Sequence, residues 1–179
     1  MATPVLIAFG ANVDPLKNLH QGLSTLHREI NLADISTVWR TDPLPDPNQK
    51  AEYDLGDSYL NGAVLSHIQV DPFNLKKMLK KIEATCCRVP NQNRYAPRPI
   101  DLDVVMMGDE IINSPGLTLP DPDILQRCFV ALPVAQLAPE LVHPVEHKSL
   151  AQLAAGFHVL EGKMAVDEEA TSLLQSIIK

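Results

Sequence analysis

The segment APRPIDLDVVMMG, residues 96–108, combines an aliphatic run with two acidic residues. Residues 100–107 are aliphatic apart from Asp101 and Asp103, and prolines precede them while a glycine follows, which is typical of a buried strand. Because side chains alternate along a strand, the two aspartates project to one face, separated by roughly 6.6 Å of rise. At a carboxylate separation of about 5 Å and an effective dielectric of about 20, they repel each other by roughly 3 kcal/mol. We therefore expect a cation between them.

Three further strands and two amphipathic helices precede this segment. Strands are indicated at 5–9, 35–40 and 59–67, and the helices follow residues 14 and 71. The resulting order, βαββαβ, predicts an α+β protein with a ferredoxin-like core, an open sheet that carries both helices on one face. Extra helices from the C-terminal third are expected on the other face, giving three layers, α-β-α. We expect residues 1–179 to form a single domain.

Three helices are expected to begin with an Asp-Pro pair: Asp14-Pro15, Asp71-Pro72 and Asp121-Pro122. In each, the carboxylate would accept a hydrogen bond from a first-turn amide, and the proline would fill a position whose N–H has no helical partner. Two segments, 42–58 and 88–99, are rich in Pro, Asn and Asp and show no periodicity. They are either binding loops or plain surface connections.

Composition excludes several classes of function. The formal net charge of -7 argues against a broad surface for a phosphate backbone, so no nucleic-acid partner is expected. No apolar run approaches the ~20 residues of a membrane span, and the N-terminus lacks the basic flank of a secretory signal. We expect a cytoplasmic monomer without a membrane partner. Its three cysteines, Cys86, Cys87 and Cys128, are interpreted as reduced thiols.

The two aspartates suggest a magnesium site. Carboxylates without accompanying His or Cys suit Mg²⁺, which takes one or two of them and completes its shell with water and phosphate oxygens. Arg88, Arg94 and Arg98 lie just upstream, and guanidinium groups bind phosphate in bidentate fashion. Together these residues predict a site for a magnesium-bound triphosphate. The plainer alternatives are the solvated end of an ordinary strand and a solvated arginine-containing loop.

A lysine cluster lies upstream on the second helix, at Lys76, Lys77, Lys80 and Lys81. Such a cluster could bind an anion. A solvated helix face opposite the apolar stripe is the commoner arrangement, and it is the one we expect here.

With these residues in place, the sequence resembles the 6-hydroxymethyl-7,8-dihydropterin pyrophosphokinase family. The family signature corresponds to residues 97–105, PRPIDLDVV. Similar segments are spread along the chain: FGAN at 9–12, WRTDPL at 39–44, SYLNGAV at 58–64, IEATCCRV at 82–89 and LPVAQLAPELVHP at 132–144. The resemblance implies an enzyme of folate biosynthesis that transfers pyrophosphate from ATP to the pterin alcohol, releases AMP and uses two Mg²⁺ ions.

The resemblance also implies a set of site residues. Asp101 and Asp103 would hold both metal ions, while Arg88 and Arg98 would contact the phosphates during transfer. The nucleotide would be bound by Lys80, Glu83, Val104, Thr118 and Arg127. The pterin would be bound by Thr41, Pro43, Leu44, Tyr59, Asn61, Tyr95 and Phe129. Within that set, Tyr59 and Phe129 would stack on the ring and Asn61 would read its amide edge. Without the resemblance, a place in an ordinary core is the commoner role for both aromatics.

Some positions depart from the family pattern. Asp121 stands where the family commonly has a phosphate-contacting His, Lys80 replaces a Gln near adenine, and Pro90 replaces a loop Arg. We expect an active enzyme with weakened nucleotide binding. Two alternatives stay open: another Mg-dependent phosphoryl or nucleotidyl transferase, and a non-catalytic relative that binds pterin or nucleotide.

Overall fold

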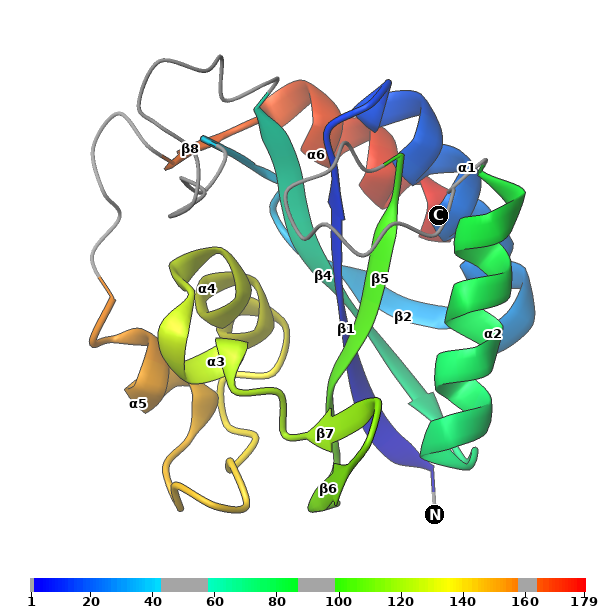
Figure 1. The fold of residues 1–179 in the computed structure, drawn as a ribbon. Helices are drawn as coiled ribbons and strands as arrows, with labels where there is room; N and C mark the ends of the chain where they lie inside the picture. The colour runs from blue at the N-terminus through cyan, green and yellow to red at the C-terminus, as the bar shows by residue number, and fades with distance from the viewer. Residues whose placement is uncertain (1, 43–57, 87–98, 158–163) are drawn as a thin grey trace, which may run out of the picture.

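The computed structural model describes residues 2–42, 58–86, 99–157 and 164–179 (Figure 1). The first two thirds of the chain alternate between strands and two long helices: β1 Thr3–Ala11, α1 Pro15–Ile30, β2 Leu32–Ile35, β3 Trp39–Thr41, β4 Tyr59–Ile68, α2 Pro72–Thr85 and β5 Asp101–Met107. The remaining third consists of short elements: β6 Ile112–Ser114, β7 Leu117–Leu119, α3 Asp123–Gln126, α4 Cys128–Leu137, α5 Leu150–Ala154, β8 Met164–Val166, α6 Glu168–Gln175 and a 3-10 turn, Ser176–Ile178.

Six strands form one antiparallel sheet in the order β5-β1-β4-β3-β8, with β2 also paired to β4. The long strand β1 pairs with β4 over its whole length and with β5 on its other side. This leaves β5 at an edge of the sheet. Strands β6 and β7 form a separate antiparallel pair.

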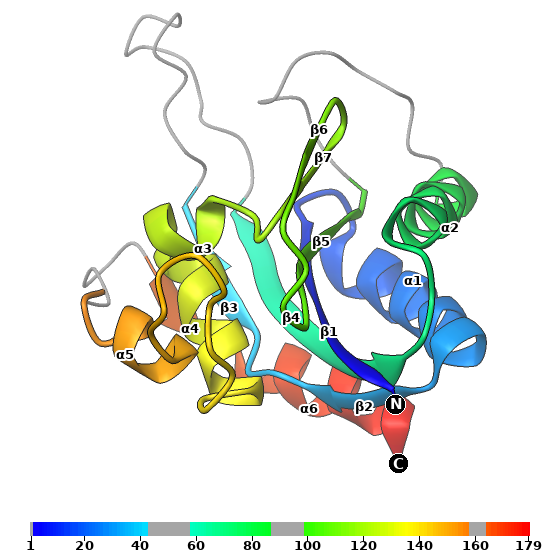
Figure 2. The ribbon, with the colours of Figure 1, turned by 90° about the horizontal axis from the view of Figure 1, so that it is seen from below.

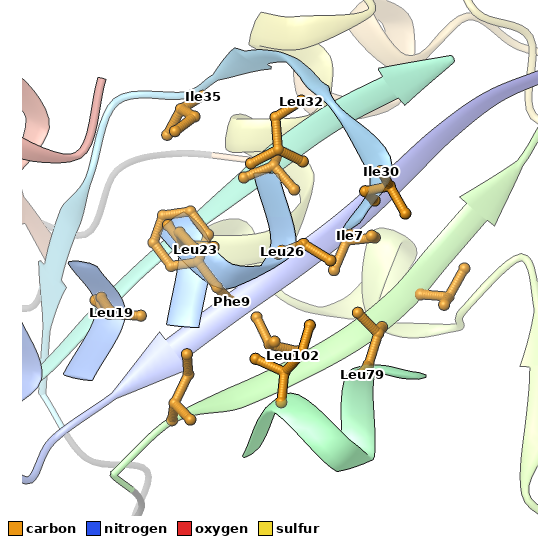
Figure 3. Packing of buried hydrophobic residues seen from close by; sticks show 14 of the residues in the cluster. Ile7, Phe9, Leu19, Leu23, Leu26, Ile30, Leu32, Ile35, Leu79 and Leu102 are labelled. Atoms are coloured by element: carbon orange, nitrogen blue, oxygen red, sulfur yellow. The ribbon is translucent and has the colours of Figure 1, made fainter. Parts of the chain in front are cut away.

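Helices cover both faces of the sheet (Figures 1 and 2). Helices α1, α2 and α6 lie on one face, and α3, α4 and α5 on the other. Each face has its own apolar core, and Figure 3 shows part of the larger one, where Ile7, Phe9 and Leu102 of the sheet meet Leu23 of α1 and Leu79 of α2. The core of the second face is centred on Leu6 and Met106 of the sheet and on side chains from α3, α4 and α5. The prediction of mixed helices and sheet is therefore confirmed.

The strand predicted at 35–40 is wrong in one respect, because it is two strands. Between β2 and β3, Ser36 N–H still donates to Ala63 O of β4 (3.0 Å), but the next two amides bind side chains of other elements. Thr37 N–H donates to Gln136 Oε1 (3.0 Å) and Val38 N–H to Thr171 Oγ1 (2.8 Å). These hydrogen bonds replace the ladder locally. Both strands nevertheless pair with β4, so the sheet order is unaffected.

The three predicted Asp-Pro caps have different outcomes. Asp71 caps α2 as expected, because its Oδ1 accepts from Asn74 N–H at 2.9 Å. Asp14 does not cap α1, since it has a left-handed conformation (φ 39°) and makes no side-chain capping bond. Asp121 accepts from Asp123 N–H at 2.8 Å, but Pro122 takes the cap position of the short helix α3. An Asp-Pro pair therefore marks a helix start more reliably than it defines the capping bond.

Candidate active site

One row of residues runs across four neighbouring strands of the sheet. In the observed register, Asp101 of β5 pairs with Gly10 of β1, Gly10 with Asn61 of β4, and Asn61 with Trp39 of β3. Residues that pair across antiparallel strands project to the same face. Their face is the one covered by α4, because Ala63, two residues after Asn61, belongs to the core beneath that helix. The predicted metal ligands and the predicted pterin amide thus share one face of the sheet.

Asn61 is held by a buried hydrogen bond. Its Nδ2 donates to Thr41 Oγ1 at 2.8 Å, and both side chains are buried. Its Oδ1 lies against Gly10, where an added Cβ would come within 2.7 Å of this oxygen. Sequence reasoning gave Gly10 no role, and only its place in the FGAN segment pointed to it. The structure indicates that a glycine is needed here, because a Cβ would collide with the Asn61 amide.

The aromatic residues predicted to hold the pterin lie on this side. Tyr59 begins β4 opposite Thr41, and Phe129 of α4 packs against the second core; both are partly exposed. Trp39 is a further candidate that sequence reasoning missed. Its Nε1 is buried, and within the described residues it has no hydrogen-bond partner.

The predicted cation between Asp101 and Asp103 is present in the protein itself. Lys80 Nζ of α2 lies 3.8 Å from Asp101 Oδ1 and 3.5 Å from Asp103 Oδ1. The same nitrogen donates to Glu83 Oε1 at 2.8 Å. The prediction of a uniformly solvated lysine face is therefore wrong for Lys80, whose ammonium reaches three carboxylates, whereas Lys77 and Lys81 are exposed.

Glu83 connects α2 to the free edge of the sheet. It is only 2% exposed, and its Oε1 also accepts from Leu102 N–H of β5 at 2.8 Å. An edge strand has amides without a neighbouring strand, and this carboxylate satisfies one of them. Glu83 was predicted to lie near adenosine, and its contacts here stabilise the strand that carries both aspartates.

The other residues predicted to bind the nucleotide lie around β5. Val104 is buried in the core beneath α1 and α2, so its side chain is not open to a ligand. Thr118 is exposed on β7, and Arg127 Nε lies 3.6 Å from Asp123 Oδ1. Pro43, Leu44, Arg88, Tyr95 and Arg98 lie outside the described residues, as do most of the two segments interpreted as loops.

Asp121 has an unfavourable electrostatic environment. Burial raises the pKa of its carboxyl above the usual value, and the negative charges of Asp123 and Asp103 raise it further. The hydrogen bond from Asp123 N–H and the charge of Lys76 act in the opposite direction. A third acid near Asp103 therefore makes this corner of the site more negative.

The donor set fits magnesium better than a transition metal. In the part of the chain that the structure describes, no group of three His, Cys, Asp or Glu side chains is placed to hold a metal ion. Mg²⁺ does not need such a cage, because one or two carboxylates suffice when water and phosphate complete its shell. Asp101 and Asp103, with oxygens around one cation position, meet that requirement.

These features define a class: an α+β protein whose sheet carries a paired-carboxylate site and a buried amide on one face. A family model described as 7,8-dihydro-6-hydroxymethylpterin-pyrophosphokinase (HPPK) matches residues 6–139. The chain therefore belongs to the HPPK family.

Individual relatives agree with this assignment. The chain is 33% identical over 147 residues to the Folic acid synthesis protein fol1 of Schizosaccharomyces pombe, a match that covers 80% of this chain and 19% of that protein. It is 30% identical over 147 residues to the 2-amino-4-hydroxy-6-hydroxymethyldihydropteridine pyrophosphokinase of Pseudomonas aeruginosa, covering 80% and 86%. The chain thus spans about a fifth of the first relative and most of the second.

Solved structures share the fold. An HPPK-DHPS triple mutant of Plasmodium falciparum matches with a TM-score of 0.67 at 13% identity, covering 94% of this chain and 47% of that one. An HPPK-DHPS structure in complex with substrates gives the same TM-score and identity, with coverage of 94% and 50%. At this identity the likeness concerns the fold alone.

Proposed function

We propose that this chain transfers pyrophosphate from ATP to 6-hydroxymethyl-7,8-dihydropterin in folate biosynthesis, with release of AMP and with Mg²⁺ as the metal. One observation carries the proposal: within the span matched by the family, the Asp101–Asp103 pair and the Asn61–Thr41 hydrogen bond lie on one face of the sheet. This juxtaposition would provide a subsite for a metal-bound polyphosphate beside a subsite for a flat heterocycle.

The reaction needs positioning and charge neutralisation rather than a covalent intermediate. The pterin hydroxymethyl oxygen attacks the β-phosphorus of ATP, and the bond from that phosphorus to the oxygen bridging the α-phosphate breaks. AMP leaves with the bridging oxygen, and the hydroxyl proton passes to solvent. Holding the two reactants in line is the main contribution expected of the protein.

Asp101 and Asp103 are the residues that would hold the metal, which we take to be two Mg²⁺ ions on the strength of the resemblance. When bound, the metal would neutralise charge that develops on the phosphate oxygens. The chain's own part is to hold two carboxylates close together on a strand fixed by the β1 ladder and by Glu83. Arg88 and Arg98 are proposed to contact the phosphates. Lys80, Val104, Thr118 and Arg127 are proposed to line the nucleotide subsite.

The pterin subsite is proposed around Asn61. Since Asn61 Nδ2 already donates to Thr41, the amide has a fixed orientation from which it can recognise donors and acceptors on a ring edge. Tyr59 and Phe129 would stack on the ring faces, and Tyr95 and the backbone at Pro43 and Leu44 would complete the pocket.

The proposal also covers the topology of the core, the number of domains, the oligomeric state and the cellular location. The order β5-β1-β4, with β2 and β3 beyond β4, supports a ferredoxin-like core. A single domain over residues 1–179, a monomeric state and a cytoplasmic location stay predictions. Among the described residues, no helix is both long enough and apolar enough to span a bilayer.

AMP formation tests the proposed activity. Purified protein is mixed with ATP, Mg²⁺ and the hydroxymethyl pterin, and AMP is followed over time. We expect AMP that requires the pterin, and a loss of about 100-fold or more in Asp103→Ala. Asp109→Ala is the matched control, because Asp109 is an exposed carboxylate just after the same strand. AMP formation without pterin would favour a different transferase, and pterin binding without AMP a non-catalytic relative.

A further inference from the structure

We propose that Lys80 is a built-in counter-ion of the Asp101–Asp103 pair, which a divalent cation must displace, so that metal binding depends on the nucleotide. The inference rests on the proposed function because it takes these aspartates as the metal ligands. It concerns a side chain that the proposed function places beside the nucleotide and not among the metal ligands.

The ammonium of Lys80 lies in the middle of a carboxylate cluster. Its Nζ is 2.8 Å from Glu83 Oε1, 3.5 Å from Asp103 Oδ1 and 3.8 Å from Asp101 Oδ1. The side chains of Asp101 and Asp103 are 18% and 46% exposed, and that of Lys80 is 40% exposed. A cation held by the same two carboxylates would have to share their immediate surroundings with this positive charge.

The three interactions differ in length, and this difference allows Lys80 to leave the two aspartates. The bond to Glu83 has hydrogen-bond length, and Glu83 is fixed by burial and by Leu102 N–H. The longer distances to Asp101 and Asp103 indicate ion pairs without short hydrogen bonds. Lys80 can therefore release both aspartates while it stays bound to Glu83. This movement takes the ammonium away from both aspartates without unfolding any element.

A metal ion alone gains little from this exchange. It replaces one charge between the aspartates with another while a neighbouring ammonium repels it. A metal that arrives with a polyphosphate brings negative charge, which offsets the ammonium. The affinities for metal and nucleotide are therefore coupled, and by linkage each ligand strengthens the other by the same factor.

Metal binding to the nucleotide-free protein tests the inference. Mn²⁺, which is visible by electron paramagnetic resonance, is titrated into wild type and Lys80→Met. We expect Lys80→Met to bind Mn²⁺ about tenfold more tightly than wild type, within the usual range of such couplings. With a non-cleavable α,β-methylene analogue of ATP present, the difference between the two proteins should shrink.

Two variants serve as matched controls. Lys77→Met makes the same substitution on an exposed lysine of α2, and Lys80→Arg keeps the charge, so both should bind Mn²⁺ as weakly as wild type. Because Lys80→Met removes a partner of buried Glu83, its melting temperature without metal should fall, and Mn²⁺ should raise it more than in wild type. If Lys80→Met does not fold, Lys80→Gln, which keeps a donor for Glu83, takes its place.

The outcomes separate this inference from the proposed function. Equal or weaker Mn²⁺ binding in Lys80→Met and Lys80→Gln would overturn the role of Lys80. If Mn²⁺ binds with the ATP analogue but the affinity is unchanged in Asp103→Ala, the metal site of the proposed function is wrong. If Mn²⁺ binding requires Asp103 but is unaffected by the Lys80 substitutions, the proposed function stands and only the counter-ion role of Lys80 is wrong.

Discussion

At the scale of single residues, the site depends on a few close approaches around β1. Gly10 is the centre of the row that joins Asp101 to Asn61, and it has no side chain to separate them. Polar groups that are both buried and fixed are suited to recognition, because their orientation is set before the ligand arrives. Asn61 meets this condition through Thr41 on one side and Gly10 on the other.

Gly10→Ala is expected to impair the pterin subsite. The new Cβ would lie 2.7 Å from Asn61 Oδ1, so the amide must move and weaken its bond to Thr41. Overpacking of this kind costs about 1–3 kcal/mol of unfolding free energy, and pterin affinity should fall more than ATP affinity. Titration calorimetry with each ligand measures this. Gly156→Ala, whose Cβ would make only an ordinary 3.5 Å contact, is the control. Unchanged pterin affinity in Gly10→Ala would contradict the assigned subsite.

Asp121→Asn is expected to raise both stability and nucleotide affinity at neutral pH. The folded-state pKa of Asp121 is raised chiefly by burial, so ionisation costs more in the folded protein than in the unfolded chain. This cost is absent below the unfolded pKa of 3.8, grows as the pH rises from there to the higher folded pKa, and is constant above it. Asparagine keeps an Oδ1 acceptor for Asp123 N–H without the charge.

Melting curves against pH measure this effect. As the pH rises above 3.8, the melting temperature of Asp121→Asn should increasingly exceed that of wild type. Below pH 3.8 the two melting temperatures should be equal. Asp121→His, which introduces the residue that the resemblance implies at this position, should also bind the nucleotide more tightly. If ATP affinity is normal in wild type and does not improve in Asp121→His, the interpretation of this position is wrong.

At the scale of secondary-structure elements, α2 both covers and fixes the edge strand. Its apolar residues, such as Leu75 and Leu79, pack in the core beneath the sheet, while Lys80 and Glu83 reach the edge of β5. The edge amide of Leu102 would otherwise be open to pairing with another chain. The same helix therefore supports the metal ligands and shields the strand that carries them.

Replacing Glu83 tests this role. Glu83→Ala leaves Leu102 N–H without its partner and Lys80 without its hydrogen bond, so we expect a loss of about 1–3 kcal/mol in unfolding free energy. Glu83→Gln keeps an oxygen for Leu102 N–H and should lose less. Urea denaturation of both variants provides the comparison. Equal losses would show that the hydrogen bond to β5 contributes little.

The turn between α4 and α5 contains a buried histidine that makes stability depend on pH. His143 Nδ1 accepts from Glu146 N–H at 3.1 Å and from Val145 N–H at the longer distance of 3.3 Å. Burial lowers the pKa of His143, while the charge of Glu146 raises it to a smaller extent. The neutral ring is thus the form that the fold requires, since a protonated Nδ1 has no lone pair to accept with.

We therefore expect stability to fall as the pH drops below about 6.5, where the unfolded histidine takes up a proton but the folded one does not. The loss should level off below the lowered folded pKa. His143→Asn, whose Oδ1 can accept the same amide bonds, should flatten this part of the melting temperature curve. His20→Gln, on the exposed side of α1, should leave the curve as in wild type. A slope equal in wild type and His143→Asn would contradict this role.

How much of each element was predictable depended on the range of the interactions involved. The apolar periodicities of α1 and α2 are local, and these helices were predicted correctly. The division of 35–40 into two strands depends on Gln136 and Thr171, which lie about a hundred residues or more away. The contact of Lys80 with β5 likewise depends on packing, because helical periodicity alone placed it on the solvated side. The carboxylate pair, in contrast, followed from strand alternation and predicted the need for a nearby cation.

At the scale of the whole molecule, segments far apart in the chain pair to complete the sheet. Strand β8 extends the sheet beyond β3, and Asp167, directly after it, forms an ion pair with Arg40. Helix α6 follows and contributes Ala170 and Leu174 to the core that also holds α1 and α2. The sequence after Gly162 suggested a loosely docked helix, whereas the structure has strand β8 there as well and buries Ala170 and Leu174 of α6. Packing against α1 decides which side of this helix is buried.

The C-terminal helix should therefore be needed for the stability of the whole fold. Leu174 is fully buried, whereas its neighbour Leu173 is 40% exposed, so the two leucines form a matched pair on one helix. Leu174→Ala removes core contacts and leaves a cavity, which costs about 2–5 kcal/mol of unfolding free energy, while Leu173→Ala should change it by less than about 0.5 kcal/mol. Urea denaturation followed by circular dichroism measures both. Because β3 carries Thr41 and pairs with β8, Leu174→Ala should also weaken pterin binding near its melting temperature. Equal stabilities of the two variants would mean that α6 is not an integral part of the core.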